Sequence, residues 1–249
     1  MIVQGKKALV TGGAAGFGLR LTERLVEEGA SVVVFDVNEG AIDALEARLS
    51  GVRGIICDVG DDGQVDQAVE SALGYLGSID ILVNNAGLMK SAPLVNPLGR
   101  DDRRHSRELW HRVMNVNLNS VFYVGSTVAD RMMRDRRKGV IVNVSSIAAK
   151  GNAGQSAYAS SKAAIDSLTK VWAKELGSYG IRCASVSPGF SNTKGAIDAL
   201  ENELLERWVG QVPLRRLGEI DEVVDAILFV IKNDFFNGRI LEIDGGLVI

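Results

Sequence analysis

Tyr158 and Lys162 are the two side chains whose types and spacing best suit chemistry. They stand four residues apart in the stretch 145–162, which reads S-S-I-A-A-K-G-N-A-G-Q-S-A-Y-A-S-S-K. On a helix, residues four apart lie on one face, one turn from each other. A tyrosine has an ordinary pKa of about 10, and a nearby ammonium lowers it. The pair predicts a general acid or base that works near neutral pH, although Y-x-x-x-K alone also fits a surface pair without a role.

A glycine-rich loop near the start of the chain favours the chemical interpretation. It reads T-G-G-A-A-G-F-G over residues 11–18, between an expected strand and an expected helix. Glycine lets a backbone approach a pyrophosphate, and a helix N-terminus offers free N–H groups and a positive dipole end. A plain turn explains a lone glycine cluster, but this context predicts a dinucleotide site. Its binding residues are Gly12, Ala15, Gly16, Phe17 and Gly18.

Asp36 indicates which dinucleotide the site prefers. It lies twenty residues after Gly16, at the end of the second expected strand. A carboxylate there accepts hydrogen bonds from ribose hydroxyls and repels a 2′-phosphate. Its neighbour is Val37 rather than an arginine, and residues 13–15 carry no cation. These features predict NAD rather than NADP; the alternative for Asp36 is a turn or helix-capping role before Asn38.

The elements that must position these groups alternate along the whole chain. Apolar, β-branched runs predict strands at 6–11, 31–36, 54–59, 79–87, 139–146, 181–186 and 239–243. Helical periodicity predicts helices at 17–28, 39–49, 62–76, 110–133, 157–179, 195–209 and 219–231. Apolar strands alternating with helices are typical of a doubly wound sheet. We therefore expect one α/β Rossmann domain over residues 1–249, with about seven parallel strands and helices on both faces.

Two segments interrupt the alternation. Residues 90–107 contain two prolines and a dense charge cluster without periodicity, which predicts a long surface loop inserted in the domain. Such a loop is functional or a tolerated insertion, and the sequence leaves both open. Residues 190–212 form a second excursion that we expect to border the substrate.

Composition excludes several other classes of protein. The chain is 46% hydrophobic and 24% charged with a net charge of −3, which gives no basic surface for nucleic acid. Its two cysteines and two histidines form no metal-binding cluster, so we expect no metal. The sequence shows neither a membrane-length apolar run nor a signal peptide. Unpaired thiols fit a reducing compartment, and we expect a cytoplasmic protein.

A set of motifs in fixed order covers essentially the whole chain. They are T-G-x-x-x-G-x-G at 11–18, C-D-V at 57–59, N-N-A-G at 84–87, N-V-N-L at 115–118, the serines at 145 and 146, Y-A-S-S-K at 158–162, S-P-G at 187–189 and D-G-G at 244–246. The chain resembles the short-chain dehydrogenases/reductases, in the branch of 3-oxoacyl-[acyl-carrier-protein] reductases and NAD-dependent secondary-alcohol dehydrogenases. The motifs are specific for fold and reaction and do not identify a substrate.

The resemblance implies four catalytic residues. Tyr158 would be the acid or base, and Lys162 would bind the nicotinamide ribose and lower the Tyr158 pKa. Asn117 would hold a water in a proton relay to Lys162. The serine is Ser146 when counted from the strand start and Ser145 when counted back from Tyr158. A loop absorbs a one-residue deletion more easily than a strand absorbs a register shift, so we choose Ser146.

The resemblance also implies the remaining contacts of the cofactor. Asp58 and Val59 would hold the adenine, next to Asp36 and Val37 at the ribose. Further contacts are expected along the cleft and around the nicotinamide, from Asn85, Ala86, Gly87, Pro188, Gly189, Ser191 and Thr193. Most relatives are homotetramers, so a homotetramer, or a homodimer, is expected.

The expected activity is hydride transfer between NAD(H) and a secondary alcohol or ketone. The segments expected to line the cleft carry mostly apolar residues, which predicts a largely apolar or neutral substrate. Lys150 could meet an acidic group, or it is an exposed lysine without a role. The alternatives are a 3-oxoacyl-thioester reductase, which G-N-A-G-Q at 151–155 resembles, and a dinucleotide-binding sensor without catalysis.

Overall fold

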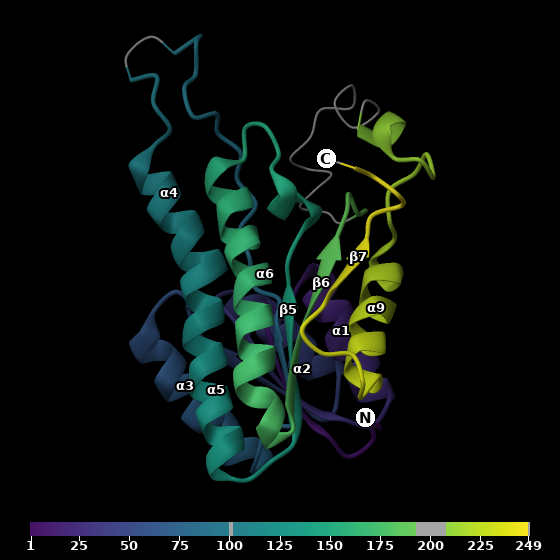
Figure 1. Cartoon of the computed structure of the whole chain (residues 1–249). Helices are drawn as coiled ribbons and strands as arrows, with labels where there is room; N and C mark the ends of the chain where they lie inside the picture. The colour runs from purple at the N-terminus through teal and green to yellow at the C-terminus, as the bar shows by residue number, and fades with distance from the viewer. Residues whose placement is uncertain (100–101, 193–207, 249) are drawn as a thin grey trace.

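Seven parallel strands form one sheet in the computed structural model of the chain, which describes residues 1–99, 102–192 and 208–248 (Figure 1). The spatial order is β3-β2-β1-β4-β5-β6-β7, so the direction of winding reverses between β1 and β4. The strands are β1 (Lys7–Thr11), β2 (Ser31–Asp36), β3 (Val52–Ile56), β4 (Ile81–Asn84), β5 (Gly139–Val144), β6 (Ile181–Pro188) and β7 (Ile240–Ile243). This topology confirms the doubly wound α/β fold expected from the alternating pattern.

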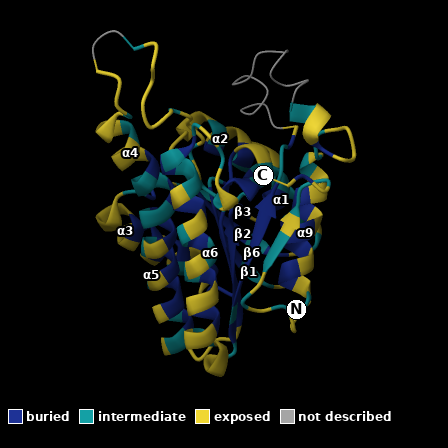
Figure 2. Ribbon diagram, turned by 45° about the horizontal axis from the view of Figure 1, so that its top comes forward, coloured by how far each residue is buried: buried dark blue, intermediate teal, exposed yellow. Residues whose placement is uncertain are grey.

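Helices cover both faces of the sheet. One face packs against α1 (Gly16–Glu27), α2 (Glu39–Arg48) and α9 (Ile220–Lys232), and the other against α3 (Asp62–Leu76), α5 (Ser120–Arg134) and α6 (Ser156–Leu176). Successive strand residues alternate between the two cores: Val10 faces the first and Leu9 the second. The strands are therefore buried on both sides, as Figure 2 shows in dark blue between the partly exposed helices.

Side-chain caps explain why several helices begin where they do. Asn38, Asp61 and Ser106 each accept a hydrogen bond from the backbone N–H three residues on, at the starts of α2, α3 and α4 (Arg107–Met114). Gly77 ends α3 in the left-handed conformation, at φ 76°. These local signals account for the agreement between expected and observed helix bounds.

Some strand bounds were predicted wrongly, by two or more residues. β3 covers Val52–Ile56 rather than 54–59, because its partner β2 ends at Asp36, which pairs with Ile56. β4 ends at Asn84 rather than at 87, because the Asn85 side chain turns back to donate to the Thr11 and Gly12 carbonyls. Apolar composition continues past the end of the sheet in both places, and composition alone cannot show where pairing stops.

The helix expected at 110–133 is continuous but not uniform. It begins earlier, as α4 at Arg107, and continues through η1 (Asn115–Asn119) into α5. η1 is a π-helical turn, a rare irregularity that is frequent at functional sites. Two short 3₁₀ turns, η2 (Ile147–Lys150) and η3 (Gly177–Tyr179), flank α6.

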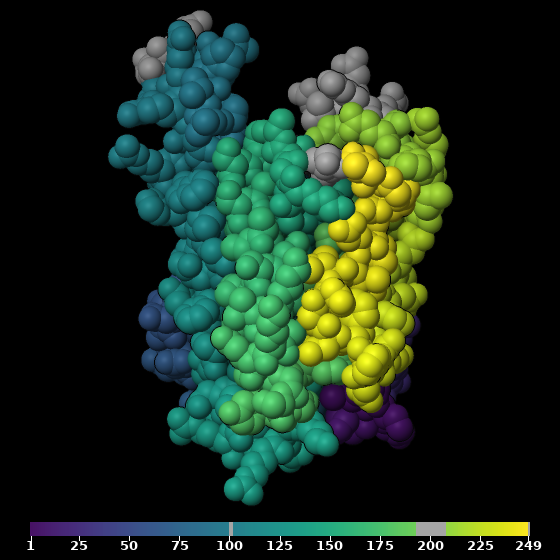
Figure 3. All heavy atoms as spheres, in the orientation of Figure 1, coloured from purple at the N-terminus to yellow at the C-terminus, as the bar shows by residue number. Residues whose placement is uncertain are grey.

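The described residues of the segment 90–107, which are 90–99 and 102–107, form an arm that stands clear of the body, in blue-green at the upper left of Figures 1 and 3. Its two sides are held by an antiparallel bridge between Val95 and Arg104. At its base, the Ala92 N–H donates to the Gly154 carbonyl at 2.7 Å. The arm therefore contacts the loop that precedes Tyr158.

The expected excursion at 190–212 lies mostly outside the described residues. Phe190 and Trp208, on either side of the gap, pack with ring centroids 4.0 Å apart. Within the described ranges, no helix combines the length and apolarity needed to cross a membrane.

Candidate active site

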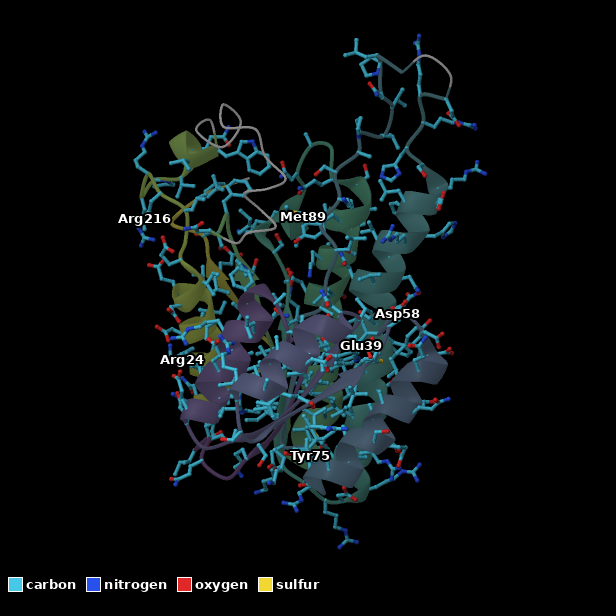
Figure 4. The ribbon with its side chains drawn as sticks, turned by 180° about the vertical axis from the view of Figure 1, so that it is seen from behind. Arg24, Glu39, Asp58, Tyr75, Met89 and Arg216 are labelled. Atoms are coloured by element: carbon cyan, nitrogen blue, oxygen red, sulfur yellow. The ribbon has the colours of Figure 1, made fainter. Side chains whose placement is uncertain are left out.

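The candidate site lies at the carboxyl ends of the paired strands β1 and β4, where the direction of winding reverses. In a doubly wound sheet this reversal opens a crevice that binds ligands. The motif residues at 11–18, 36, 84–87, 145–146 and 188–191 all lie at or just beyond these strand ends. Figure 4 shows Met89, shortly after β4, toward this end of the molecule, and Tyr75 of α3 toward the opposite end.

The glycine loop is built for close approach of backbones. A Cβ on Gly18 would lie 2.1 Å from the Gly12 carbonyl oxygen, a contact that no side chain can make. Gly12 and Gly16 have φ of 60° and 53°, which favours glycine. The Asn85 amide donates to the Gly12 carbonyl at 3.0 Å and joins this loop to the end of β4.

The first turn of α1 is free for an anion. Ala15 precedes the helix and provides no side-chain cap, and the first turn contains no acidic residue. The N–H groups at a helix start lack intrahelical partners and carry the positive end of the dipole. The chain therefore presents backbone donors next to glycines that leave room for a phosphate.

Asp36 lies at the end of β2, with its carboxylate held against the glycine loop. Oδ2 accepts from the Ala14 N–H at 3.2 Å, and Oδ1 accepts from the Asn38 N–H at 3.1 Å. The second bond is the turn role considered as the alternative, so the carboxylate has a local structural partner as well. Val37 beside it is 67% exposed and leaves the approach to Asp36 open.

The two residues expected at the adenine follow β3. Asp58 is exposed, and its Oδ1 accepts from the Gly60 N–H at 2.9 Å. Val59 is buried. The next strand, β4, continues into Asn85 and Ala86, whose N–H groups both donate to the Thr11 hydroxyl at 3.0 Å. Thr11 thus joins β1 to the N-N-A-G segment.

Asn117 lies in the π-helical turn and is fully buried. Its Oδ1 accepts from the Leu88 N–H at 2.7 Å, and its Nδ2 donates to the Leu88 carbonyl at 3.1 Å. A Cβ on Gly87 would lie 3.6 Å from Asn117 Oδ1 and 3.7 Å from Lys162 Nζ. The structure therefore brings Asn117, Gly87 and Lys162 together.

Tyr158 and Lys162 lie one turn apart on α6, with Nζ 5.7 Å from the centre of the phenol ring. Ser146, just past β5, provides a hydrogen bond to the phenol. Its Oγ also accepts from the Ala148 N–H at 3.2 Å, which fixes the hydroxyl. The predicted serine, tyrosine and lysine thus form one cluster at the ends of β5 and α6.

Ser145 faces a different group. It is 3% exposed, and its hydroxyl lies near two acceptors, the Lys162 carbonyl at 3.3 Å and the Asp166 carboxylate. The two serines therefore contact opposite ends of the same helical segment.

Burial controls the pKa values of the pair. Burial raises the pKa of the Tyr158 phenol, and the hydrogen bond from Ser146 opposes that rise. Burial lowers the pKa of the Lys162 ammonium to about 8, because removal from water disfavours the charged form. Burial dominates the Tyr158 pKa, and the lowering of this pKa by Lys162 stays a prediction. The ammonium donates to the Val144 carbonyl at 2.7 Å.

The turn after β6 closes the site on the other side. The Gly189 N–H donates to the Ile243 carbonyl at 2.8 Å, and a Cβ on Gly189 would lie 2.7 Å from Asp244 Cα. Ser191 is buried, with its hydroxyl 3.3 Å from the Gly189 carbonyl. Thr193, the other residue expected at the carboxamide, lies outside the described residues.

Three contacts of the site were missed from the sequence. Thr11 positions the N-N-A-G segment through its hydroxyl. Gln155 positions the base of the arm through a hydrogen bond to Ser91 at 3.2 Å. Lys150 is neither idle nor free for a substrate, because it donates to Glu242 of β7 at 2.7 Å. Asp166 is a further member of the cluster, and the only sign of it in the sequence is its four-residue spacing from Lys162.

Comparison with known proteins extends over nearly the full chain. The profile of a family described as enoyl-(acyl carrier protein) reductase matches residues 12–248. A 3-oxoacyl-[acyl-carrier-protein] reductase of Thermotoga maritima is 39% identical over 256 residues, which covers 100% of both chains. A gluconate 5-dehydrogenase of Gluconobacter oxydans is 33% identical, covering 99% of this chain and 96% of that one.

A solved structure is also similar to this chain over nearly its full length. The crystal structure of an NAD⁺-bound xylitol dehydrogenase superposes with a TM-score of 0.89 at 31% identity, covering 99% of this chain and 100% of that one.

Proposed function

Because the chain belongs to the short-chain dehydrogenase/reductase family, we propose that it transfers hydride between NAD(H) and a secondary alcohol or ketone. As a member of that family it is an oxidoreductase that acts on CH–OH groups. The observation that carries the proposal is the cluster of Ser146, Tyr158 and Lys162, with Asn117 beside Lys162. The four side chains come from three parts of the chain: Asn117 from η1, Ser146 from the segment after β5, and Tyr158 and Lys162 from α6.

The residues present fit a dinucleotide. The uncapped start of α1 offers N–H donors, and Gly12 and Gly18 leave room for a pyrophosphate. The half-buried Asp36 supports NAD over NADP, because its carboxylate accepts hydrogen bonds from ribose hydroxyls and repels a phosphate. Asp58 and Val59 are assigned to the adenine, and Pro188, Gly189 and Ser191 to the nicotinamide.

Each member of the cluster has a proposed task. When bound, NAD supplies the acceptor for the hydride of the alcohol. As a phenolate, Tyr158 takes the hydroxyl proton, and Ser146 hydrogen-bonds the oxygen as negative charge develops on it. Lys162 supplies a buried positive charge beside the phenol, and Asn117 continues the polar path beyond Lys162.

The pKa of Tyr158 affects whether ketone reduction or alcohol oxidation is favoured at a given pH. Because burial raises this pKa above its ordinary value, the residue is a neutral phenol at pH 7. A neutral phenol can donate a proton to a ketone oxygen but cannot accept one from an alcohol. We therefore propose that reduction predominates near neutral pH and that alcohol oxidation increases with pH.

The substrate is proposed to be neutral or largely apolar. Lys150 of η2, the turn that follows Ser146, is paired with Glu242, which reduces its ability to attract an acidic substrate. The second candidate is reduction of a 3-oxoacyl thioester, the activity named for the Thermotoga maritima relative that matches the full chain. Asp36 argues for the first candidate, since it disfavours NADPH.

Assembly and location are also proposals. Phe229 and Phe235, at the end of α9 and just after it, are 45% and 100% exposed, and Val248 is 86% exposed. Large exposed apolar side chains near an edge strand favour a subunit interface, and we propose a homotetramer or homodimer. The two free, buried cysteines favour the cytoplasm.

A substrate panel tests the proposal. The purified chain is assayed with secondary alcohols, sugar alcohols and 3-oxoacyl thioesters, using NAD(H) and NADP(H), and cofactor absorbance is followed. We expect turnover with a neutral alcohol or ketone and a preference for NAD(H). The control is Tyr158→Phe, which should lose orders of magnitude in turnover and retain NAD binding.

Other outcomes separate the alternatives. Preferential reduction of the thioesters with NADPH would support the second candidate. NAD binding without turnover across the panel would support a sensor. Near-normal turnover of Tyr158→Phe would contradict the assignment of the acid or base.

A further inference from the structure

Asp166 is a half-buried carboxylate one helical turn beyond Lys162. Tyr158, Lys162 and Asp166 follow each other at four-residue intervals on α6, so the three side chains lie on one face. Oδ1 of Asp166 is buried and has no hydrogen-bond partner among the described residues. A carboxylate in this condition is costly to maintain unless a nearby charge or donor compensates.

Ser145 links Asp166 to the turn that carries Lys162. Its hydroxyl has one hydrogen and faces two acceptors, the Lys162 carbonyl at 3.3 Å and the Asp166 carboxylate. Ser145 is also held by the sheet, since its N–H donates to the Val186 carbonyl at 2.8 Å. The carboxylate is therefore positioned from β5, next to the serine that contacts Tyr158.

The charges around Asp166 come from three elements. Burial raises the pKa of the Asp166 carboxyl; Lys170 and Lys162 on its own helix favour the carboxylate, and Glu242 of β7 opposes it. Lys150 of η2 neutralises Glu242 through the ion pair at 2.7 Å. Lys170 is exposed to solvent, which screens its charge, whereas Lys162 is 4% exposed. The interaction between Asp166 and Lys162 is the one that water screens least.

The buried ammonium depends on such a partner. Burial lowers the Lys162 pKa to about 8, and Asp166 is the charge that raises it. Without that carboxylate, a larger fraction of Lys162 would be neutral under mildly alkaline conditions, where alcohol oxidation is favoured.

We propose that Asp166, which lies beside Ser145, is a positioning residue of the active site that keeps Lys162 charged beside Tyr158. This inference rests on the proposed function, because the charge on Lys162 matters for turnover only if Tyr158 exchanges the substrate proton. Asp166 acts through Lys162 and is not assigned a contact with substrate.

The first test measures Lys162 without using activity. The full chain is labelled with ¹³C-lysine, the Lys162 ε-carbon signal is assigned with Lys162→Arg, and its pH titration is followed by NMR. Asp166→Asn should lower the Lys162 pKa by about one unit, and Asp166→Glu should restore it. Asp130→Asn is the matched control, because Asp130 also has a basic residue four positions on, Arg134, at 2.7 Å. An unchanged Lys162 pKa in Asp166→Asn overturns the proposal.

The second test uses the pH profile of alcohol oxidation. For Asp166→Asn, kcat/KM should fall by no more than about twofold near pH 7 and by about tenfold at pH 9, since lowering the Lys162 pKa by one unit changes the charged fraction about tenfold only well above that pKa. Lys170→Met should keep the wild-type profile. A loss of equal size at every pH would indicate a merely structural role and overturn the proposal. A wild-type chain inactive on every alcohol refutes the proposed function, while the NMR titration still tests the interaction of Asp166 with Lys162.

Discussion

Ser146 hydrogen-bonds the phenol of Tyr158, twelve residues further along the chain. The bond joins the end of β5 to the first turns of α6 and leaves Ser145 on the other side, near Asp166. Successive residues of an extended segment point in opposite directions, so only one of two adjacent serines can face the phenol. The geometry supports Ser146 as the hydroxyl that meets substrate oxygen.

Single alanine substitutions should separate the two serines. Ser146→Ala should reduce kcat about 10²- to 10³-fold, the usual effect of removing one donor to a developing oxyanion. Ser145→Ala should reduce kcat by less than about tenfold, since it acts only through Asp166 and Lys162. Steady-state kinetics on the same alcohol decides, and the reverse ranking would assign the role to Ser145.

Cofactor preference should depend on Asp36 and its neighbour. The double variant Asp36→Ala, Val37→Arg removes the carboxylate and adds a cation at an exposed position. The loss of a charged hydrogen bond is worth about 1.5–3 kcal/mol, which predicts a 10- to 100-fold fall in kcat/KM for NAD and a gain for NADP. Kinetics with both cofactors tests this.

The single variant Val37→Arg is the control for cofactor preference. It keeps the carboxylate and should retain the preference for NAD. A double variant with unchanged preference would show that Asp36 serves only the turn with Asn38 and the contact with Ala14.

Gly18→Ala should damage the glycine loop. The new Cβ would lie 2.1 Å from the Gly12 carbonyl oxygen, and the backbone must move to relieve the clash. We expect a loss of about 1–3 kcal/mol in the free energy of unfolding and a large increase in the Kd for NAD. Urea denaturation and NAD titration measure the two effects.

Gly74→Ala is the matched control for that change. Gly74 is exposed on α3, and a Cβ there meets no atom within 4 Å. Alanine in a helix should stabilise the chain by about 0.5–1 kcal/mol relative to glycine, with unchanged NAD binding. Equal behaviour of the two variants would contradict the close approach of Gly18 to Gly12.

The buried Lys162 should leave a signature in stability against pH. Its pKa is about 8 in the folded chain and about 10.4 when unfolded, so the unfolded chain binds more protons in between. The free energy of unfolding contributed by Lys162 therefore rises with pH over that window and is lost as pH falls through 8. Between pH 8 and 9, the free energy of unfolding of wild type should rise by about 1 kcal/mol relative to that of Lys162→Met.

Denaturation of both proteins at each pH measures this difference. The buried thiols of Cys57 and Cys183, with pKa values raised to about 11 and about 12, are present in both proteins and cancel. A difference independent of pH would show that Lys162 titrates normally in the folded chain.

Local patterns were sufficient to predict the fold. Alternating apolar strands and capped helices gave the order of elements, and Asp61 and Gly77 mark the ends of α3 in the sequence itself. The end of β3 was misplaced because it depends on the length of β2, a neighbour that is distant in sequence. Pairing partners are tertiary information, and composition does not contain them.

The site was predictable as a set of residues but not as a set of contacts. The motif positions of Asn117, Tyr158 and Lys162 were visible in the sequence. The direction of the Tyr158 pKa was not, because it depends on burial by elements from distant parts of the chain. The pairing of Lys150 with Glu242 also joins residues far apart in sequence, and no pattern of sequence spacing predicts it.

The π-helical turn at Asn115–Asn119 makes the segment from 107 to 134 sensitive to chain length. A π-helical bond spans one residue more than an α-helical bond, so deleting one residue would restore a regular helix. Deleting one residue elsewhere in α4 or α5, where no such turn absorbs the change, would rotate one end relative to the other by about 100°. α4 would then turn away from α6, or α5 from α3. During divergence of this chain, insertions and deletions should therefore accumulate in the arm at 90–107 and spare the helix that carries Asn117.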